Sequence, residues 1–70
     1  MLAKQLGETI RKRRKELGIT QPHLAELATI STNTLYKLER GQSNPSLTVI
    51  NKLLEVLGME LTIEVKKNNF

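Results

Sequence analysis

Apolar residues recur at the spacing of an α-helix over most of this chain, in four short segments separated by small residues. The segments cover residues 3–17, 21–28, 32–39 and about 47–57. Hydroxyl residues suited to cap a helix N-terminus precede the last three segments: Thr20, Ser31 and Ser46. Glycines follow three of the segments, at positions 18, 41 and 58. The sequence therefore predicts a mainly α fold with four helices.

The apolar positions of these segments define the predicted core. The residues expected to face inward are Leu6, Ile10, Leu17, Leu24, Ala25, Ala28, Leu35, Leu38, Leu47, Ile50, Leu53, Leu54 and Leu57. A chain of 70 residues makes one small domain and buries only about 60% of its unfolded surface. Because it has no cysteine for disulfides, we expect oligomerisation to supply further stabilisation.

The apolar pattern changes period after Gly58. Residues 59–66 alternate between apolar and polar, and the apolar positions are Met59, Leu61, Ile63 and Val65. This two-residue period predicts a single half-buried β-strand, which has no partner strand in the chain. A symmetric homodimer with antiparallel strands satisfies its backbone most simply. Addition to another protein's sheet and a frayed tail are the alternatives.

The composition argues against an enzyme and against a membrane protein. The single His23 and the absence of cysteine exclude the usual metal and thiolate sites, so we expect no cofactor and no catalytic residues. No apolar run approaches the roughly 18 residues of a membrane span. The first residues lack the apolar segment of a signal peptide, and we expect a cytoplasmic protein.

The basic excess lies near the N-terminus. The net charge is +4, and residues 1–20 contain six bases and two acids, so they carry the whole excess. Five of these bases form the run Arg11–Lys15. Such a cluster is typical of proteins that contact phosphates. The alternative is a solvated helix end whose cations complement the helix dipole.

Two segments of eight residues, separated by three residues, predict a helix-turn-helix at 21–39. The second helix of this motif presents its outward side chains to base edges in the major groove. The residues expected to face the bases are Thr32, Asn33, Tyr36 and Lys37, with Thr34 at the flank. Asn33 can bond adenine, Lys37 can reach guanine, and Tyr36 can also contact phosphate or sugar. The alternative is an ordinary exposed polar helix face.

Several short motifs fall in an order that resembles the lambda-repressor-like (Xre/Cro-type) DNA-binding domain. They are Gly18-Ile19-Thr20-Gln21, Leu24-Ala25, Ile30-Ser31, Thr34-Leu35, Leu38-Glu39-Arg40-Gly41, Asn44-Pro45-Ser46-Leu47 and Leu57-Gly58. The resemblance covers about residues 5–58. It implies phosphate contacts from Gln21, Thr34, Arg40, Asn44, Ser46 and Arg11. It also implies that Gln21 buttresses the recognition helix and that Arg14 and Glu39 form a structural salt bridge.

The turn between the two helices departs from this family's pattern at Thr29. The family usually has glycine there, because the backbone adopts a left-handed conformation. A threonine in that conformation is strained. We therefore expect either a slightly different turn or a tolerated strain.

The C-terminal strand resembles the layout of HipB-type antitoxin repressors, in which the strands of a dimer pair. This resemblance implies autorepression of a toxin–antitoxin operon and binding of a HipA-type kinase toxin. Phe70 is either an anchor for such a partner or a disordered terminus. The expected organisation is a DNA-binding domain at 1–58, a dimerisation strand of the same domain at 59–66, and a flexible tail at 67–70.

The predicted function is a homodimeric, sequence-specific regulator of transcription, most simply a repressor, on a pseudo-palindromic double-stranded DNA operator. The alternatives are a stand-alone Xre-type repressor without a toxin, and a protein-interaction module that has lost DNA binding. Such a module is expected to carry acidic or apolar residues at 32, 33, 36 and 37, and this chain carries none except the aromatic ring of Tyr36.

Overall fold

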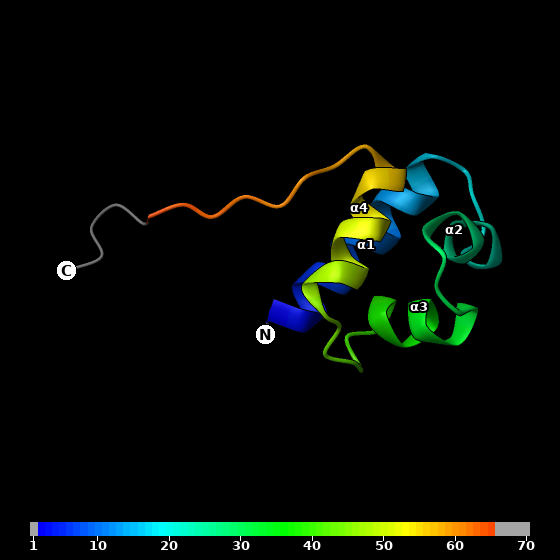
Figure 1. Ribbon diagram of the computed structural model, residues 1–70, viewed down its shortest axis with the longest axis horizontal. Helices are drawn as coiled ribbons and strands as arrows, with labels where there is room; N and C mark the ends of the chain where they lie inside the picture. Colours follow the sequence, from blue (N-terminus) through cyan, green and yellow to red (C-terminus); the bar gives the residue numbers. More distant parts are fainter. Residues whose placement is uncertain (1, 66–70) are drawn as a thin grey trace.

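The computed structural model describes residues 2–65 and contains four helices within them (Figure 1). Their bounds are α1 Leu2–Glu16, α2 Gln21–Ala28, α3 Thr32–Glu39 and α4 Leu47–Leu57. The prediction of a mainly α fold with four helices is confirmed. Only α1 differs from the predicted bounds, by one residue at each end.

Hydroxyl side chains cap three of the helices at their N-termini. The Oγ1 of Thr20 accepts a hydrogen bond from the backbone N–H of His23 at 3.3 Å. Ser31 and Ser46 accept in the same way from residues three positions further on, at 3.0 and 3.2 Å. Each bond satisfies a donor that the first helical turn leaves free. The predicted cap positions of α2, α3 and α4 are confirmed.

All four helices end in the same pair of backbone hydrogen bonds, the Schellman motif. After α4, Gly58 N–H donates to the Glu55 carbonyl at 3.3 Å, and Met59 N–H donates to the Leu54 carbonyl at 2.9 Å. The motif requires one residue with a positive φ. This residue is a glycine after α1, α3 and α4, but it is Thr29 after α2. Thr29 has φ 59° and ψ 43°, so the usual turn is kept and its strain is tolerated.

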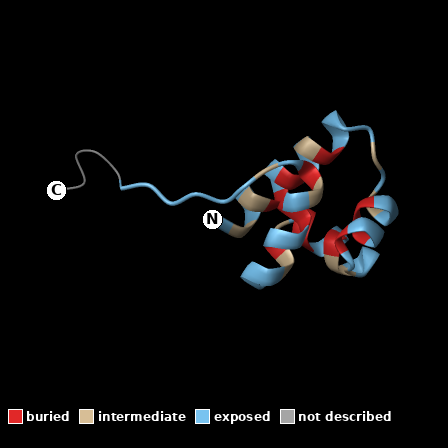
Figure 2. Cartoon of the chain, turned by 45° about the horizontal axis from the view of Figure 1, so that its top comes forward, coloured by how far each residue is buried: buried red, intermediate tan, exposed pale blue. Residues whose placement is uncertain are grey.

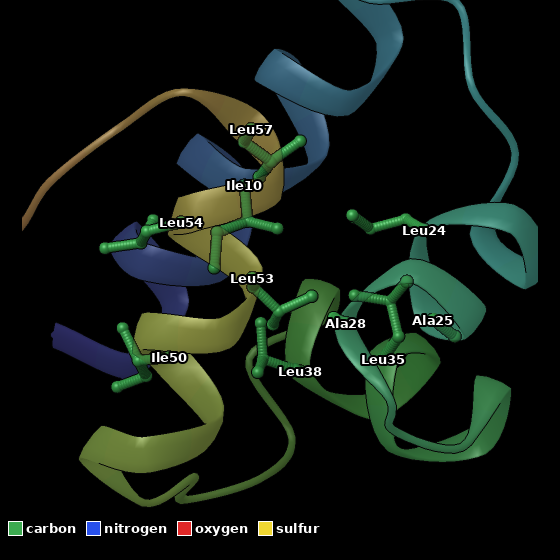
Figure 3. Close-up of a cluster of buried hydrophobic side chains, with 10 residues drawn as sticks. All are labelled: Ile10, Leu24, Ala25, Ala28, Leu35, Leu38, Ile50, Leu53, Leu54 and Leu57. Atoms are coloured by element: carbon green, nitrogen blue, oxygen red, sulfur yellow. The ribbon is translucent and has the colours of Figure 1, made fainter.

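The core is formed by ten buried apolar residues drawn from the four helices (Figure 3). They are Ile10, Leu24, Ala25, Ala28, Leu35, Leu38, Ile50, Leu53, Leu54 and Leu57. The prediction that Leu17 and Leu47 face inward is wrong, since they are 43% and 66% exposed. Leu17 follows the last residue of α1, and Leu47 is the first residue of α4, so neither is carried onto the buried face of its helix.

A glycine brings α1 and α3 into close contact. A Cβ atom at Gly7 would collide with the Leu38 carbonyl oxygen and would lie 3.0 Å from that of Glu39. Both obstacles are backbone atoms of α3, so no side-chain rotation can relieve them. Gly7 therefore sets the distance at which α1 crosses the end of α3.

Residues 59–65 leave α4 as an extended segment that runs away from the helices (Figure 1). The prediction of a β-strand at 59–66 is wrong for this single chain, because no strand occurs in its described part. A ladder requires hydrogen bonds from a second strand, and the helices leave no sheet edge for it. Leu61, Ile63 and Val65 are 50%, 95% and 88% exposed. Figure 2 draws the extended segment in pale blue, the colour of exposed residues. Lys66, the predicted flexible tail 67–70 and Phe70 lie outside the described residues.

Candidate nucleic-acid interface

The structure places α2 and α3 as a compact pair joined by the three-residue turn 29–31. Their facing sides are buried, with Leu24 and Leu35 fully inaccessible to solvent. Because Leu35 and Leu38 point into the core (Figure 3), the opposite side of α3 faces solvent. This arrangement is the helix-turn-helix that the segment lengths predict, and it leaves one face of α3 free to enter a groove.

Four side chains make up that outward face of α3, which we call the recognition face. Its members are exposed and polar or aromatic: Thr32, Asn33, Tyr36 and Lys37. Tyr36 is 45% exposed, and its ring lies beneath the Arg40 guanidinium, 5.3 Å from ring centroid to Cζ. This cation–π contact holds Arg40 beside the recognition face while leaving its charge in solvent.

A buried ion pair joins α1 to the end of α3. The Arg14 guanidinium donates from Nε to Glu39 Oε2 at 2.7 Å and from Nη2 to Oε1 at 2.9 Å. The two residues are only 9% and 4% exposed. Arg14 Nη1 also donates to the Ile19 carbonyl at 2.9 Å. The hydrogen bond to Glu39 raises the pKa of Arg14 above its usual value, although burial acts in the opposite direction.

Gln21 extends this ion pair into a three-residue network. Its amide Nε2 donates to Glu39 Oε1 at 2.9 Å, so the first residue of α2 is tied to the last residue of α3. Gln21 is half-buried, and this bond orients its side chain. The structure therefore supplies the contact through which Gln21 can buttress α3. Spacing alone could not show that its partner is Glu39.

Basic side chains gather in a hollow of about 380 Å³ between α1 and the C-terminus of α3. Its lining is Lys4, Glu8, Arg11, Glu39, Arg40 and Gln42. Three of these are cations, and of the two carboxylates Glu39 already pairs with Arg14. We call Lys4, Arg11 and Arg40 the basic cluster. A surface of this kind attracts phosphate.

Three residues of this hollow, Lys4, Glu8 and Gln42, were not predicted as site residues from the sequence. Lys4 precedes Arg11 by seven positions, two helical turns, so their shared side of α1 could have been recognised from spacing. The proximity of Lys4 to the C-terminal end of α3 could not have been recognised in this way. A Cβ atom at Gly41 would lie 2.9 Å from the Lys4 Cα, which shows how closely the start of α1 packs against this loop.

The remaining predicted phosphate contacts lie at helix N-termini. Thr34 is half-buried, and its Oγ1 accepts from the Ser31 hydroxyl at 2.7 Å, so it belongs to the cap of α3. Asn44 and Ser46 are exposed on the loop before α4, and the Ser46 hydroxyl caps that helix.

The predicted dimer residues Leu61, Ile63 and Val65 lie on the extended segment, away from α2 and α3 (Figure 1).

The described residues contain neither a metal-binding group nor a membrane-spanning helix. Within residues 2–65, the His and Glu side chains form no group of three placed to hold a metal ion. None of the four helices is long and apolar enough to cross a membrane.

Curated relatives of the chain are described as regulators of transcription. It is 43% identical over 51 residues to an uncharacterised HTH-type transcriptional regulator of Methanothermobacter thermautotrophicus, covering 73% of this chain and 74% of that protein. It is 37% identical over 55 residues to a similar regulatory protein of Aeropyrum pernix, covering 79% of this chain. It spans only 17% of the Aeropyrum protein.

Solved structures show the same architecture. The clp gene regulator ClgR of Corynebacterium glutamicum matches with a TM-score of 0.81 and 32% identity, over 84% of this chain and 63% of that one. The restriction-modification controller protein C.AhdI of Aeromonas hydrophila matches with a TM-score of 0.79 and 34% identity, over 83% of this chain and 84% of that one.

The family assignment follows from these matches together with the geometry of α2 and α3. The relatives carry general regulator names, so the HipB-type subfamily stays a prediction. A helix-turn-helix family model matches residues 10–63, which include α2, α3 and α4 in full. The chain therefore belongs to this helix-turn-helix family of the Xre/Cro type, as its motifs predict.

Proposed function

We propose that this protein is a sequence-specific DNA-binding regulator of transcription that reads the major groove with the recognition face of α3. The observation that carries the proposal is the exposure of Thr32, Asn33 and Lys37 on a helix whose other side is fully buried. Amide and ammonium groups discriminate base edges by hydrogen bonding, Asn with adenine and Lys with guanine. Rigid packing of α3 supports this, because readout depends on a fixed orientation.

Phosphate contacts complete the proposed interface. The basic cluster of Lys4, Arg11 and Arg40 lies at the end of α3, where it can meet the DNA backbone beside the groove. Gln21, Thr34, Asn44 and Ser46 are proposed to add neutral contacts from helix N-termini. These interactions set register and affinity, while the recognition face sets sequence preference.

We propose further that the protein binds as a homodimer and acts as a repressor on a pseudo-palindromic operator. The exposed apolar row Leu61, Ile63 and Val65 supports this, because such a row normally requires a partner. In the phage repressors with this motif, half-sites lie about one helical turn (~34 Å) apart or a multiple of it, and we expect the same here.

A gel-shift assay on the DNA upstream of the protein's own gene tests the function. We expect a shifted complex that survives an excess of unrelated DNA, and loss of that selectivity in Asn33→Ala. Asn51→Ala is the matched control, since Asn51 is exposed on α4, outside α2 and α3. Absence of binding to that fragment and to a random-sequence library at low salt would overturn the proposal.

Autoregulation of a toxin–antitoxin operon with a HipA-type kinase toxin is the more specific form of this function. It is supported by the order of elements, a four-helix core followed directly by an alternating segment. A kinase-like reading frame beside the gene, whose product co-purifies with this protein, is the expected result. An unrelated neighbour with no complex would leave a stand-alone repressor, or an interaction module if DNA binding also fails.

A further inference from the structure

Arg40 lies at the junction between the recognition face and the basic cluster. It follows the last residue of α3, and its backbone N–H donates to the Tyr36 and Lys37 carbonyls at 3.3 and 3.2 Å. Its side chain is exposed and lines the hollow beside α1. A cation at this place is beside the groove when α3 lies in it, so the direction of its guanidinium affects phosphate binding.

Carboxylates do not hold this guanidinium. Neither of the two ion pairs within residues 2–65 includes Arg40. The adjacent Glu39 carboxylate is already committed, because both of its oxygens accept from Arg14 and one also accepts from Gln21. The contact that the structure gives Arg40 is with the Tyr36 ring, whose centroid is 5.3 Å from Cζ, within cation–π range.

This contact leaves Arg40 able to bind a phosphate. A guanidinium carries five N–H donors, and a cation–π contact depends on its charge and not on those donors. It can therefore lie over a ring and still donate to a phosphate. A long side chain loses rotamer freedom when a ligand fixes it, and this loss lowers the affinity. The ring restricts Arg40 before DNA binds, so part of the loss is removed from the binding step.

The same contact limits what Tyr36 can do at the bases. Its ring is 45% exposed, and the Arg40 guanidinium lies over it. The bases of a duplex are stacked, so a side chain in the groove meets their edges, which it reads by hydrogen bonds and methyl contacts. The ring has no group for such an edge except its hydroxyl. Asn33 and Lys37 have polar groups suited to base edges and are exposed on the same helix.

We propose that Tyr36 is a positioning residue whose ring holds the Arg40 guanidinium in place to bind a DNA phosphate at the edge of the groove. The bases are then read by the other three members of the recognition face. This inference rests on the DNA-binding function proposed above, and it differs from the expectation that Tyr36 itself contacts the bases.

Fluorescence anisotropy with two DNA probes tests the role of the ring. The probes are the fragment upstream of the gene and a mixed-sequence duplex of equal length, because losing a phosphate contact weakens both equally. Tyr36→Leu removes the ring and is expected to weaken binding about threefold on both probes, the size of an exposed cation–π contact. Tyr36→Phe keeps the ring and is expected to bind like the unmodified protein.

A double-mutant cycle tests whether the ring acts through Arg40. Arg40→Gln is expected to weaken binding about tenfold and to reduce the salt dependence of log K by about one phosphate contact. In the Arg40→Gln background, Tyr36→Leu is expected to cause no further loss, because no cation remains for the ring to position. Arg11→Gln is the matched control, since Arg11 belongs to the same basic cluster but lies on α1. In that background Tyr36→Leu should keep its threefold effect.

NMR of the free protein tests the contact without DNA. Protons of the Arg40 side chain that lie over an aromatic ring are shifted upfield by it. We expect this shift in the unmodified protein and in Tyr36→Phe, and its loss in Tyr36→Leu. Both side chains are exposed, so the variants are expected to remain folded, which the rest of each spectrum reports.

Four outcomes would overturn this role of Tyr36. Equal weakening by Tyr36→Phe and Tyr36→Leu assigns a contact to the hydroxyl, and weakening on the upstream fragment alone assigns a base contact. Equal effects of Tyr36→Leu in the Arg40→Gln and Arg11→Gln backgrounds remove the coupling, and absence of the ring-dependent shift removes the contact. All four leave the proposed function intact. Failure of the unmodified protein to bind either probe overturns the proposed function itself, and this role with it.

Discussion

At the scale of single residues, the proposed function depends on which side chains of α3 contact the bases. Lys37 and Asn33 are both exposed on α3, and exposure alone does not show whether each side chain contacts a base or a phosphate. A base contact changes sequence preference, whereas a phosphate contact changes affinity for every sequence equally. Measuring the affinity of each variant for several DNA sequences can therefore assign each residue to a base contact or a phosphate contact.

Lys37→Ala is expected to lose discrimination at one or two base pairs, at a cost of about 1–3 kcal/mol. Binding to the operator and to single-base variants is measured at one salt concentration. Lys52→Ala serves as control, because it removes the same charge from an exposed position on α4. Equal weakening on all sequences would instead assign Lys37 to a phosphate.

Thr29→Gly is expected to stabilise the protein by about 1 kcal/mol. Thr29 occupies the left-handed region at φ 59°, where a Cβ-bearing residue costs roughly 1–2 kcal/mol and glycine costs none. Urea unfolding measures the gain, and Thr29→Asn should fall between the two. Lower stability of the glycine variant would show that the threonine side chain makes a contact worth more than its strain.

At the scale of elements, α3 is held in place by groups that lie far apart in the sequence. Arg14 of α1 and Gln21 of α2 both bond to Glu39, and Gly7 allows α1 to approach the end of α3. The recognition face therefore has an orientation that depends on three helices. Weakening this network should lower stability and DNA binding together.

Glu39→Ala is expected to cost about 3–5 kcal/mol, because it leaves the buried Arg14 charge without a partner. The double variant Arg14→Met, Glu39→Leu removes both charges and should cost less. Denaturant unfolding compares the single and double variants. Equal losses would show that packing, and not the unpaired charge, dominates.

The Arg14 charge also has a predictable pH dependence. Its pKa is raised in the folded state, so its contribution to stability is complete below the ordinary arginine pKa. That contribution declines only as the pH rises through the folded-state value, in strongly alkaline solution. We therefore expect no loss of stability from this group between neutral and moderately alkaline pH.

At the scale of the whole molecule, the 59–65 segment is the proposed connection between the domain and a second copy. Ile63 is 95% exposed, so one chain alone leaves an apolar row in water. In the proposed dimer, two half-sites of the operator are bound by one protein, and simultaneous binding raises specificity.

Ile63→Lys is expected to weaken dimerisation, because it places a charge on the apolar side of the segment. Thr62→Lys is the matched control, since it places the same charge on the polar side, where it should have little effect. Sedimentation equilibrium gives the dimer dissociation constant for each. An unchanged dimer in Ile63→Lys would reject pairing through this segment.

The four helices and their caps were determined by the sequence alone, because capping and termination act within one turn of each helix end. Thr20, Ser31 and Ser46 occupy the predicted cap positions. The conformation of Thr29 was left open by the sequence, and the structure shows that the left-handed turn is kept. The order of motifs also identified the helix-turn-helix family. These features depend on neighbours in the chain, so they can be read from it.

Only the tertiary structure decided which distant residues meet. The partnership of Gln21 with Glu39, the hollow that joins Lys4 to Arg40, and the close approach at Gly7 all depend on how α1 packs against α3. The exposure of Leu17 and Leu47 depends on where each helix ends relative to the core. The alternating segment has the local pattern of a strand but no partner within one chain. It is extended and exposed in this chain, because a strand ladder requires a second strand.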